Sequence, residues 1–249
     1  MAVNVDIVYK TVLLILNQQQ RGYMTPDEFN KTATQVQLTI FEGYASDLNQ
    51  QYRLPDNDTE YGDRVKNIEQ KLQFFQKYIN NAAVAGAITG TNPFTIDLTV
   101  VTDLYRLGSV MYQGVQLGQY SQRNEVTQLF LSPLTQPTEK FPIYLYEAGA
   151  TATSNNGLLY IFPNTIIDPD DINISYLATP VNVIWASTPG ALGEYIYAAG
   201  ASTDFQLDVS EQTEIILRIL AYAGVIIQDP SIVQLASQAV ATEDANEKS

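Results

Sequence analysis

The sequence predicts an α+β fold in which helices at both ends of the chain flank a β-rich middle. Apolar residues recur at spacings of three and four in the first third and again near the end, which is the period of amphipathic helices. Between these regions, short apolar runs are separated by Gly, Asn, Asp and Pro, as in antiparallel strands joined by turns. We expect an N-terminal helical region over 1–90, a β-rich region over 91–208, and C-terminal helices with an acidic tail over 209–249, packing on the N-terminal helices.

Three helices are predicted in the N-terminal region. The first ends at Gly22, a residue type that favours helix termination. The second has a strong start signal, with Thr25 as the N-cap, Pro26 at the first helical position and Glu28 placed to return a capping-box bond. The third follows a loop at residues 54–58. Their apolar faces comprise Val8, Val12, Leu13, Ile15 and Leu16; then Phe29, Ala33, Val36, Ile40, Tyr44 and Leu48; then Val65, Ile68, Leu72, Phe75 and Ile79.

The middle of the chain changes to the period of half-buried strands. We predict strands at 94–100, 104–112, 141–146, 158–162, 172–177 and 181–185, and a short helix within 119–131. Short strands at this spacing indicate an antiparallel sandwich or barrel. Ser210 then serves as the N-cap of a closing helix, where Glu211 and Glu214 favour the positive end of the helix dipole. Asp229-Pro230 starts a last helix that runs to about Ala241.

Two absences limit the chemistry open to this chain. It contains neither Cys nor His, which excludes thiolate nucleophiles, disulfides, the Ser-His-Asp triad and the usual zinc ligands. Asp56, Asp58 and Glu60 resemble the start of a calcium loop, but Tyr61 stands where the sharp turn needs Gly. We expect no catalytic, cofactor or metal site. A carboxylate-dependent glycan hydrolase stays open as an alternative, because paired acids suffice for that reaction.

The negative charge is concentrated in the second part of the chain. The formal net charge is −14, of which residues 141–249 contribute −11, with 2 Lys/Arg against 13 Asp/Glu. Such a surface repels phosphate, so attractive binding to nucleic acid or to an anionic membrane is not expected. The charge either maintains solubility or forms a wall past which nucleic acid slides. The apolar run at 12–16 is too short for a signal core or a membrane span, so we expect a soluble protein assembled in a cytoplasm.

Aromatic residues favour a role in assembly. The chain has 16 Tyr, a residue type enriched at protein interfaces because it combines contact area with a polar end. Several stretches, in collinear order over most of the chain, resemble virion structural proteins of tailed phages, especially the crAss-like and related marine lineages. These stretches are 17–30 (NQQQRGYMTPDEFN), 103–110 (DLYRLGSV), 132–138 (SPLTQPT) closing on FPIY at 141–144, LYIFP at 159–163 with ISYL at 174–177, and DFQL at 204–207 with ILAYAGV at 219–225.

The resemblance implies a ring protein of the head-to-tail connector, without enzymatic activity. Such a ring lies below the portal, contacts portal, connector or tail proteins, and lines a conduit through which DNA passes without specific binding. Twelvefold symmetry and location in the virion are part of the same expectation. Within that ring, we predict that Asp168, Asp170 and Asp171 face the lumen. Another virion surface or tail-associated structural protein is the alternative within the particle.

Overall fold

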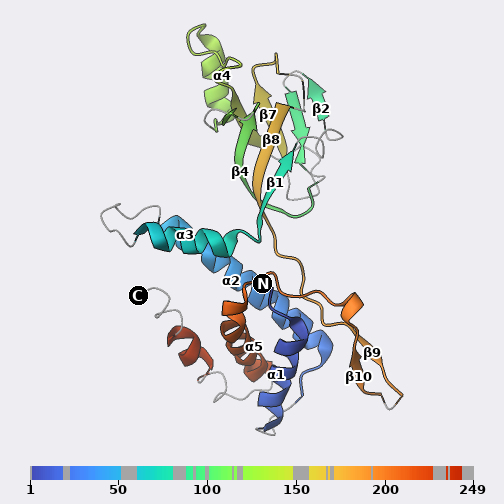
Figure 1. Cartoon of the computed structure of the whole chain (residues 1–249). Helices are drawn as coiled ribbons and strands as arrows, with labels where there is room; N and C mark the ends of the chain where they lie inside the picture. Colours follow the sequence, from blue (N-terminus) through green and yellow to red (C-terminus); the bar gives the residue numbers. More distant parts are fainter. Residues whose placement is uncertain are drawn as a thin grey trace. The chain divides into compact units, whose positions relative to one another are not determined.

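The structure, a computed structural model, confirms the α+β class (Figure 1). It describes residues 2–18, 23–51, 61–80, 88–91, 94–98, 101–113, 115–116, 120–147, 157–166, 168, 171–191, 193–226, 234 and 236–242. The helices are α1 (Val5–Gln18), α2 (Pro26–Gln51), α3 (Tyr61–Leu72), α4 (Arg123–Leu131) and α5 (Gln212–Ile226), with 3-10 turns η5 (Ala199–Ala201) and η6 (Val209–Glu211). The strands are β1 (Gln76–Asn80), β2 (Ile88–Thr91), β3 (Phe94–Asp97), β4 (Leu104–Tyr112), β5 (Val115–Gln116), β6 (Ile143–Glu147), β7 (Leu158–Phe162), β8 (Ile172–Ala178), β9 (Ser187–Pro189) and β10 (Tyr195–Tyr197).

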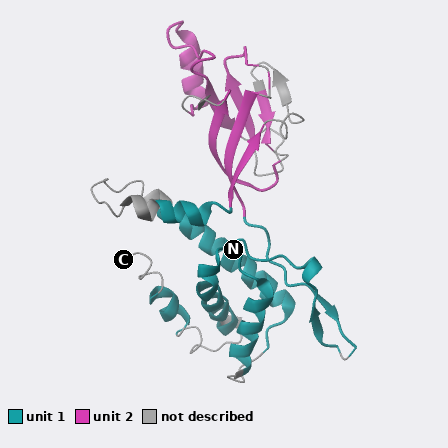
Figure 2. Cartoon of the chain, in the orientation of Figure 1, with its two compact units in different colours: residues 1–74, 180–249 teal, residues 75–179 magenta. Residues whose placement is uncertain are grey.

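The chain forms two compact units (Figure 2). Unit 1 combines residues 1–74 with residues 180–249, and unit 2 comprises residues 75–179. Unit 2 is therefore an insertion between the two parts of unit 1, and the helices from both ends of the chain belong to the same unit. No helix in the part of the chain that the structure describes is long and apolar enough to span a membrane.

Unit 1 is built on a helical core. Helix α5 packs against α1 and α2. The contact is made by apolar positions whose helical spacing is visible in the sequence, and each side chain of this size stabilises the fold by about 1.5–3 kcal/mol when fully buried. Side chains buried in this unit include Val8, Val12, Phe29, Val36, Ile40, Ile215 and Ile219.

Helix α2 begins with the predicted capping box. The Thr25 backbone N–H donates to Glu28 Oε2 at 2.9 Å, and the Glu28 N–H reaches Thr25 Oγ1 at 3.4 Å. Pro26 occupies the first helical position, where its missing N–H has no intrahelical partner to lose. The Thr25 N–H and the Thr25 hydroxyl both donate to the Glu28 carboxylate and hold its pKa below its ordinary value. The start of α2 is thus confirmed.

The third predicted helix is shorter than expected. Helix α3 ends at Leu72, and Ile79, which was assigned to its apolar face, lies in β1. There it pairs with Ile174 of β8 in an antiparallel ladder. A helical spacing of apolar residues does not by itself exclude a strand, and pairing with β8 decides the outcome. The side chain of Val65 and the stop at Gly22 lie outside the described residues, as does the side chain of Leu48.

The strand predicted at residues 181–185 is wrong. Ile184 forms an isolated antiparallel bridge with Thr203, but no ladder extends through this segment, all of which the structure describes. Its alternating burial is real, because Val183 and Trp185 are buried while Ile184 is exposed. The segment is extended and packs against α2 rather than against a strand. Side chains of α2 form hydrogen bonds with the backbone of this segment, as the backbone of a neighbouring strand would do in a sheet.

The start of the closing helix also differs from the prediction. Asp208, not Ser210, is the capping residue: its side chain accepts a bond from the Ser210 N–H at 3.1 Å and caps η6. Helix α5 follows from Gln212. Residues 236–242 are helical, whereas the predicted start of that last helix at Asp229-Pro230 lies outside the described residues.

Unit 2 contains two four-stranded sheets, one ordered β1-β8-β4-β5 and the other β2-β3-β7-β6, and all their pairs are antiparallel. The strands predicted at 104–112 and 158–162 are confirmed with the same bounds, and α4 confirms the helix within 119–131. In β4, a Cβ on Gly108 would lie 2.9 Å from the Ser175 carbonyl oxygen, so β8 approaches too closely for a larger residue.

One apolar core lies between the two sheets of unit 2. It combines Ile96, Leu159 and Ile161 from β3 and β7 with Val110 and Ile174 from β4 and β8. Residues from both sheets in one cluster define two layers facing each other, the arrangement of a sandwich. The described strands do not close into a barrel. Of the two predicted alternatives, the sandwich is the one that agrees with the structure.

Candidate interaction surfaces

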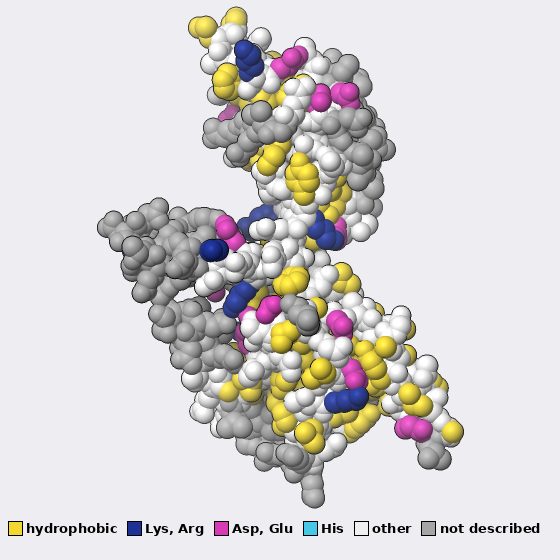
Figure 3. All heavy atoms as spheres, viewed as in Figure 1, with side chains coloured by type: hydrophobic (Ala, Val, Ile, Leu, Met, Phe, Trp, Pro, Cys, Tyr) yellow, Lys and Arg dark blue, Asp and Glu magenta, His cyan; other side chains and the backbone are white. Residues whose placement is uncertain are grey.

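Unit 2 presents an ordered apolar surface at the end of α4. We call residues 129–138, which comprise the last turn of the helix and the chain that follows it, the α4 tip. Within it, Leu131 is 80% exposed and Leu134 is 96% exposed. Figure 3 shows hydrophobic side chains gathered at this end of the unit. The α4 tip contains no charged residue. The α4 tip is therefore a candidate site of protein contact, since exposed apolar patches are a feature of such sites.

Hydrogen bonds give the α4 tip a defined shape. The Thr135 hydroxyl donates to the Leu129 carbonyl at 3.0 Å, and the Gln136 side chain donates to the Phe130 carbonyl at 3.2 Å. These bonds satisfy carbonyls that the end of a helix leaves without intrahelical partners. The turn is therefore folded back on α4, and the exposure of Leu134 belongs to a structured surface rather than to a frayed end.

The opposite side of α4 is fixed to the β sandwich. Val126 is buried, and the Phe130 ring meets the Phe162 ring edge-on with centroids 5.4 Å apart. At the start of the helix, Arg123 forms an ion pair with Glu147 of β6, with Nε 2.9 Å from Oε2. This pair is exposed, so it orients the helix more than it stabilises it. The helix thus presents the α4 tip on a rigid support.

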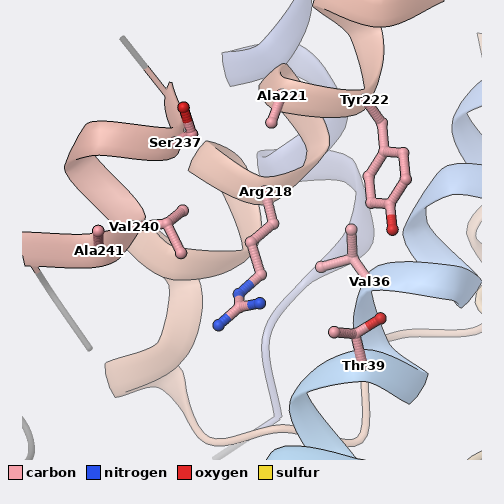
Figure 4. A pocket seen from close by; sticks show the side chains of 8 residues that line it. All are labelled: Val36, Thr39, Arg218, Ala221, Tyr222, Ser237, Val240 and Ala241. Atoms are coloured by element: carbon pink, nitrogen blue, oxygen red, sulfur yellow. The ribbon is translucent and has the colours of Figure 1, made fainter. Parts of the chain in front are cut away.

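Unit 1 contains a groove between α2, α5 and the helical residues 236–242, which we call the α2–α5 groove (Figure 4). Its volume is about 320 Å³. Val36 is fully buried, and Arg218 is the one charged side chain among the lining residues that the structure describes. The lining comprises Val36, Thr39, Arg218, Ala221, Tyr222, Ser237, Val240 and Ala241. An apolar hollow of this size can accept one or two aliphatic side chains.

A second exposed apolar element of unit 1 is the β9–β10 hairpin. Tyr195 and Ile196 are each about half exposed. The hairpin is anchored by Tyr197, whose ring stacks on Trp185 with centroids 5.7 Å apart. Trp185 in turn contacts Tyr9 of α1, at 4.3 Å between centroids. A hairpin held by an aromatic stack presents its outer residues to solvent in a fixed position.

The structure brings four charged side chains together where α3 meets the start of α5. Glu211 is 3% exposed and pairs with Lys71 at 2.9 Å, and Glu214 is 5% exposed and pairs with Arg218 at 2.5 Å. Burial raises the pKa of Glu214 to about 7, while the pKa of Glu211, despite the same burial, is held below its ordinary value by Lys71.

Sequence reasoning missed this charged cluster. Glu211 and Glu214 were assigned to the positive end of the closing helix, and their spacing of three within one turn gave no sign of burial. The only signal was indirect: Lys71 lies in the last turn of an amphipathic helix, and a buried acid requires a cation nearby. The cluster links α3 to α5 within unit 1. Since Glu214 is not part of the groove lining, its raised pKa does not define an acid that faces an open cleft.

Of the predicted lumen residues, the structure describes Asp168 and Asp171, which precede β8 in the chain. Asp168 is exposed, and Asp171 is half-buried because Gln113 binds it twice: backbone N–H to backbone O at 2.8 Å and side-chain Nε2 to Oδ2 at 3.1 Å. Asp170 lies outside the described residues. The structure does not test which way these carboxylates face in an assembly, so the lumen assignment stays a prediction.

Neither metal binding nor kinship to known proteins gives a further indication. Among the residues that the structure describes, no group of three or more acidic side chains is arranged to hold a metal ion. Asp56, Asp58 and Glu60 fall outside that part of the chain. No protein-family model matches the sequence, and no curated protein matches it.

Proposed function

We propose that this chain is a non-catalytic structural subunit of a ring at the head-to-tail connector of a tailed-phage particle. The ring joins the portal to the tail and surrounds the DNA conduit. The observation that carries the proposal is the α4 tip, where Leu131 and Leu134 stand in water on a hydrogen-bonded, charge-free turn. A monomeric protein rarely maintains such a surface, whereas an assembly subunit covers it with a partner.

The distribution of surfaces supports a ring rather than a closed dimer. Unit 1 carries the α2–α5 groove and the β9–β10 hairpin, and unit 2 carries the α4 tip. Different surfaces on different units suit head-to-tail contact between identical copies. Such contact closes into a ring when a whole number of equal rotations completes one turn without a shift along the axis. The net charge of −14 favours passage of DNA without attachment, since phosphates meet few cations.

The same features weigh against a glycan hydrolase. That reaction needs two carboxyl groups open to a sugar, with one of raised pKa as the acid. Glu214 has the raised pKa, but it is buried and bonded to Arg218. The resemblance to phage virion proteins and the exposed apolar surfaces both favour assembly. The alternative of another virion surface or tail-associated protein differs only in where the subunit is placed.

Electron microscopy of the purified chain tests the proposal. We expect closed rings of uniform diameter in negative stain, and a sedimentation coefficient that rises with protein concentration. A monomer at every concentration up to the millimolar range would contradict the ring. Incubation with a panel of bacterial cell-wall and capsule glycans tests the hydrolase alternative, for which we expect no release of reducing sugar.

A further inference from the structure

The α4 tip is prepared for a partner. Leu134 is almost fully exposed, yet the turn that carries it is fixed by bonds from Thr135 and Gln136 to carbonyls of α4. Pro133 and Pro137 restrict the chain on either side of Leu134. A side chain that is already ordered loses little conformational entropy on binding, so its contact area contributes more fully to affinity.

The α2–α5 groove is suited to an uncharged occupant. Val36, Ala221, Val240 and Ala241 contribute its apolar side chains, and none of the lining residues that the structure describes is acidic. The one cation, Arg218, is already paired with the buried Glu214, so the groove does not offer a net positive charge to an anion. Nucleic acid and anionic lipid are therefore poor candidates, and an apolar side chain is a good one.

Charge decides which protein can supply that side chain. Two copies of a chain with net charge −14 repel each other wherever their acidic surfaces meet. Contact between a tip without charged residues and the described lining of the groove, which has no acidic residue, adds no like-charge pair. In this respect the two surfaces are complementary, and they belong to the same sequence.

We propose that the α4 tip of one copy inserts into the α2–α5 groove of a second copy, with Leu134 as the side chain that enters the groove. This inference rests on the proposed ring and specifies the contact that builds it. Each copy has one tip and one groove, so the contact is heterologous and propagates from copy to copy. The groove of each subunit is filled by the next.

Two single variants test the contact by analytical ultracentrifugation. Leu134→Asp places a charge on the tip at an exposed position, so it should disturb the packing of the core little. Ala221→Phe fills the groove with a larger side chain of its own lining. Each variant should raise the protein concentration needed for assembly by about tenfold or more, because one central contact is lost. Circular dichroism checks folding, and Ala241→Glu at the exposed edge of the groove replaces Ala221→Phe if the latter does not fold.

The matched control is Leu14→Asp. Leu14 is 58% exposed on α1 and lies in neither surface, so it receives the same substitution of an exposed leucine by a carboxylate. This variant should assemble like the wild type. If Leu14→Asp blocks assembly as strongly as Leu134→Asp does, added charge alone explains the loss and the assignment of the tip is overturned.

Mixing the two variants tests the head-to-tail arrangement. Leu134→Asp retains an intact groove and Ala221→Phe retains an intact tip, so the mixture has one functional contact per pair. We expect dimers with one copy of each variant that do not grow further. If tips instead bind to tips, the mixture forms no more complex than the separate variants do, and the proposal fails.

Cross-linking provides an independent measurement. The chain contains no Cys, so Leu134→Cys and Ala241→Cys introduce the only two thiols in a mixture of the two variants. Oxidation should give a covalent dimer of mixed composition. If Leu134→Asp and Ala221→Phe both still form rings like those of the wild type, this contact is overturned but the proposed ring is not. If the wild type stays monomeric at all concentrations, the ring is overturned as well.

Discussion

The side-chain amide of Asn30 on α2 forms two hydrogen bonds with the backbone of Trp185, 155 positions further along the chain. The Trp185 N–H donates to Asn30 Oδ1 at 2.7 Å, and Asn30 Nδ2 donates to the Trp185 carbonyl at 3.3 Å. An amide side chain has the same donor and acceptor as a peptide group, so it can replace a neighbouring strand at one position.

Two further residues of α2 continue this pattern. Thr34 Oγ1 accepts from the Val183 N–H at 3.1 Å, and Gln37 Nε2 donates to the Val181 carbonyl at 2.8 Å. Spacings of three and four place these side chains on one face of the helix, and they meet alternate residues of the extended segment. The helix therefore satisfies the backbone of 181–185 without a ladder.

The first prediction concerns Gln37, which is 1% exposed. Its Oε1 also accepts from the Gln206 N–H at 2.8 Å, so the side chain joins two segments. Gln37→Met keeps the volume but leaves both backbone groups without this partner, and we expect the free energy of unfolding to fall by about 2–4 kcal/mol. Urea denaturation measures it. Gln35→Met, at an exposed position of the same helix, should change it by less than about 0.5 kcal/mol.

These contacts show why part of the fold could be predicted from the sequence. The Thr25–Glu28 capping box and the alternation at 104–112 are local, so neighbouring residues suffice to define them. The segment 181–185 alternates in the same way, but its partner is a helix face about 150 residues away. Local periodicity reports that a segment is extended and half-buried, not what covers it.

The candidate surfaces were beyond sequence reasoning for a related physical reason. Residues 132–137 read as a proline-rich connection, and nothing local indicates that Thr135 and Gln136 bind back to α4 and leave Leu134 in solvent. Likewise, the burial of Glu211 and Glu214 depends on where α3 ends and places Lys71. Assembly as a role was inferred from composition and resemblance, whereas the specific surfaces required tertiary structure.

The second prediction tests the start of α2. Thr25→Ala removes the hydroxyl that accepts the Glu28 N–H, and we expect a loss of about 1 kcal/mol in the free energy of unfolding. Thr32→Ala is the matched control: its hydroxyl bonds to the Glu28 carbonyl inside the same helix, and alanine is the better helix former there. An unchanged melting temperature for Thr25→Ala would show that another group caps α2.

The third prediction concerns pH. Burial raises the pKa of Glu214 to about 7 in the folded protein, above the 4.5 of the unfolded chain. The folded state thus binds this proton more tightly, and the associated stability is complete below about pH 4.5 and lost as pH rises through 7. The pKa of Glu211 is lowered, so its contribution is lost only as pH falls below its ordinary value.

Between pH 5 and 8, Glu214 is therefore expected to dominate the pH dependence of unit 1. Between pH 5 and 8 the free energy of unfolding of the wild type should fall by an amount on the order of 1–3 kcal/mol. Glu214→Gln keeps a neutral hydrogen-bonding group in place of the carboxyl, so this fall should be absent in the variant. Thermal unfolding at several pH values measures the difference. Glu42→Gln, at an exposed position of α2, should retain the wild-type profile. A wild type whose melting temperature rises from pH 5 to pH 8 would contradict the assignment.

The last prediction concerns the acidic turn before β8. If Asp168 faces the lumen of a ring, symmetry brings its carboxylates close together, and their repulsion opposes assembly at low ionic strength. Added salt should then lower the protein concentration at which rings form. At low salt, Asp168→Asn should form rings at the protein concentration that the wild type needs at higher salt. A ring that gripped DNA would instead lose its ligand as salt increased.

Asp27→Asn is the control, because Asp27 is an exposed acid on α2 of unit 1 and its loss changes the net charge equally. Equal effects of Asp168→Asn and Asp27→Asn would mean that overall charge, not a lumen position, governs the salt dependence. Asp171 is the weaker choice for this test, since Gln113 binds it and its removal also disturbs the turn. A density map that places residues 168–171 on the outer rim would reject the lumen position directly, while the ring and its tip-to-groove contact would stand on their own tests.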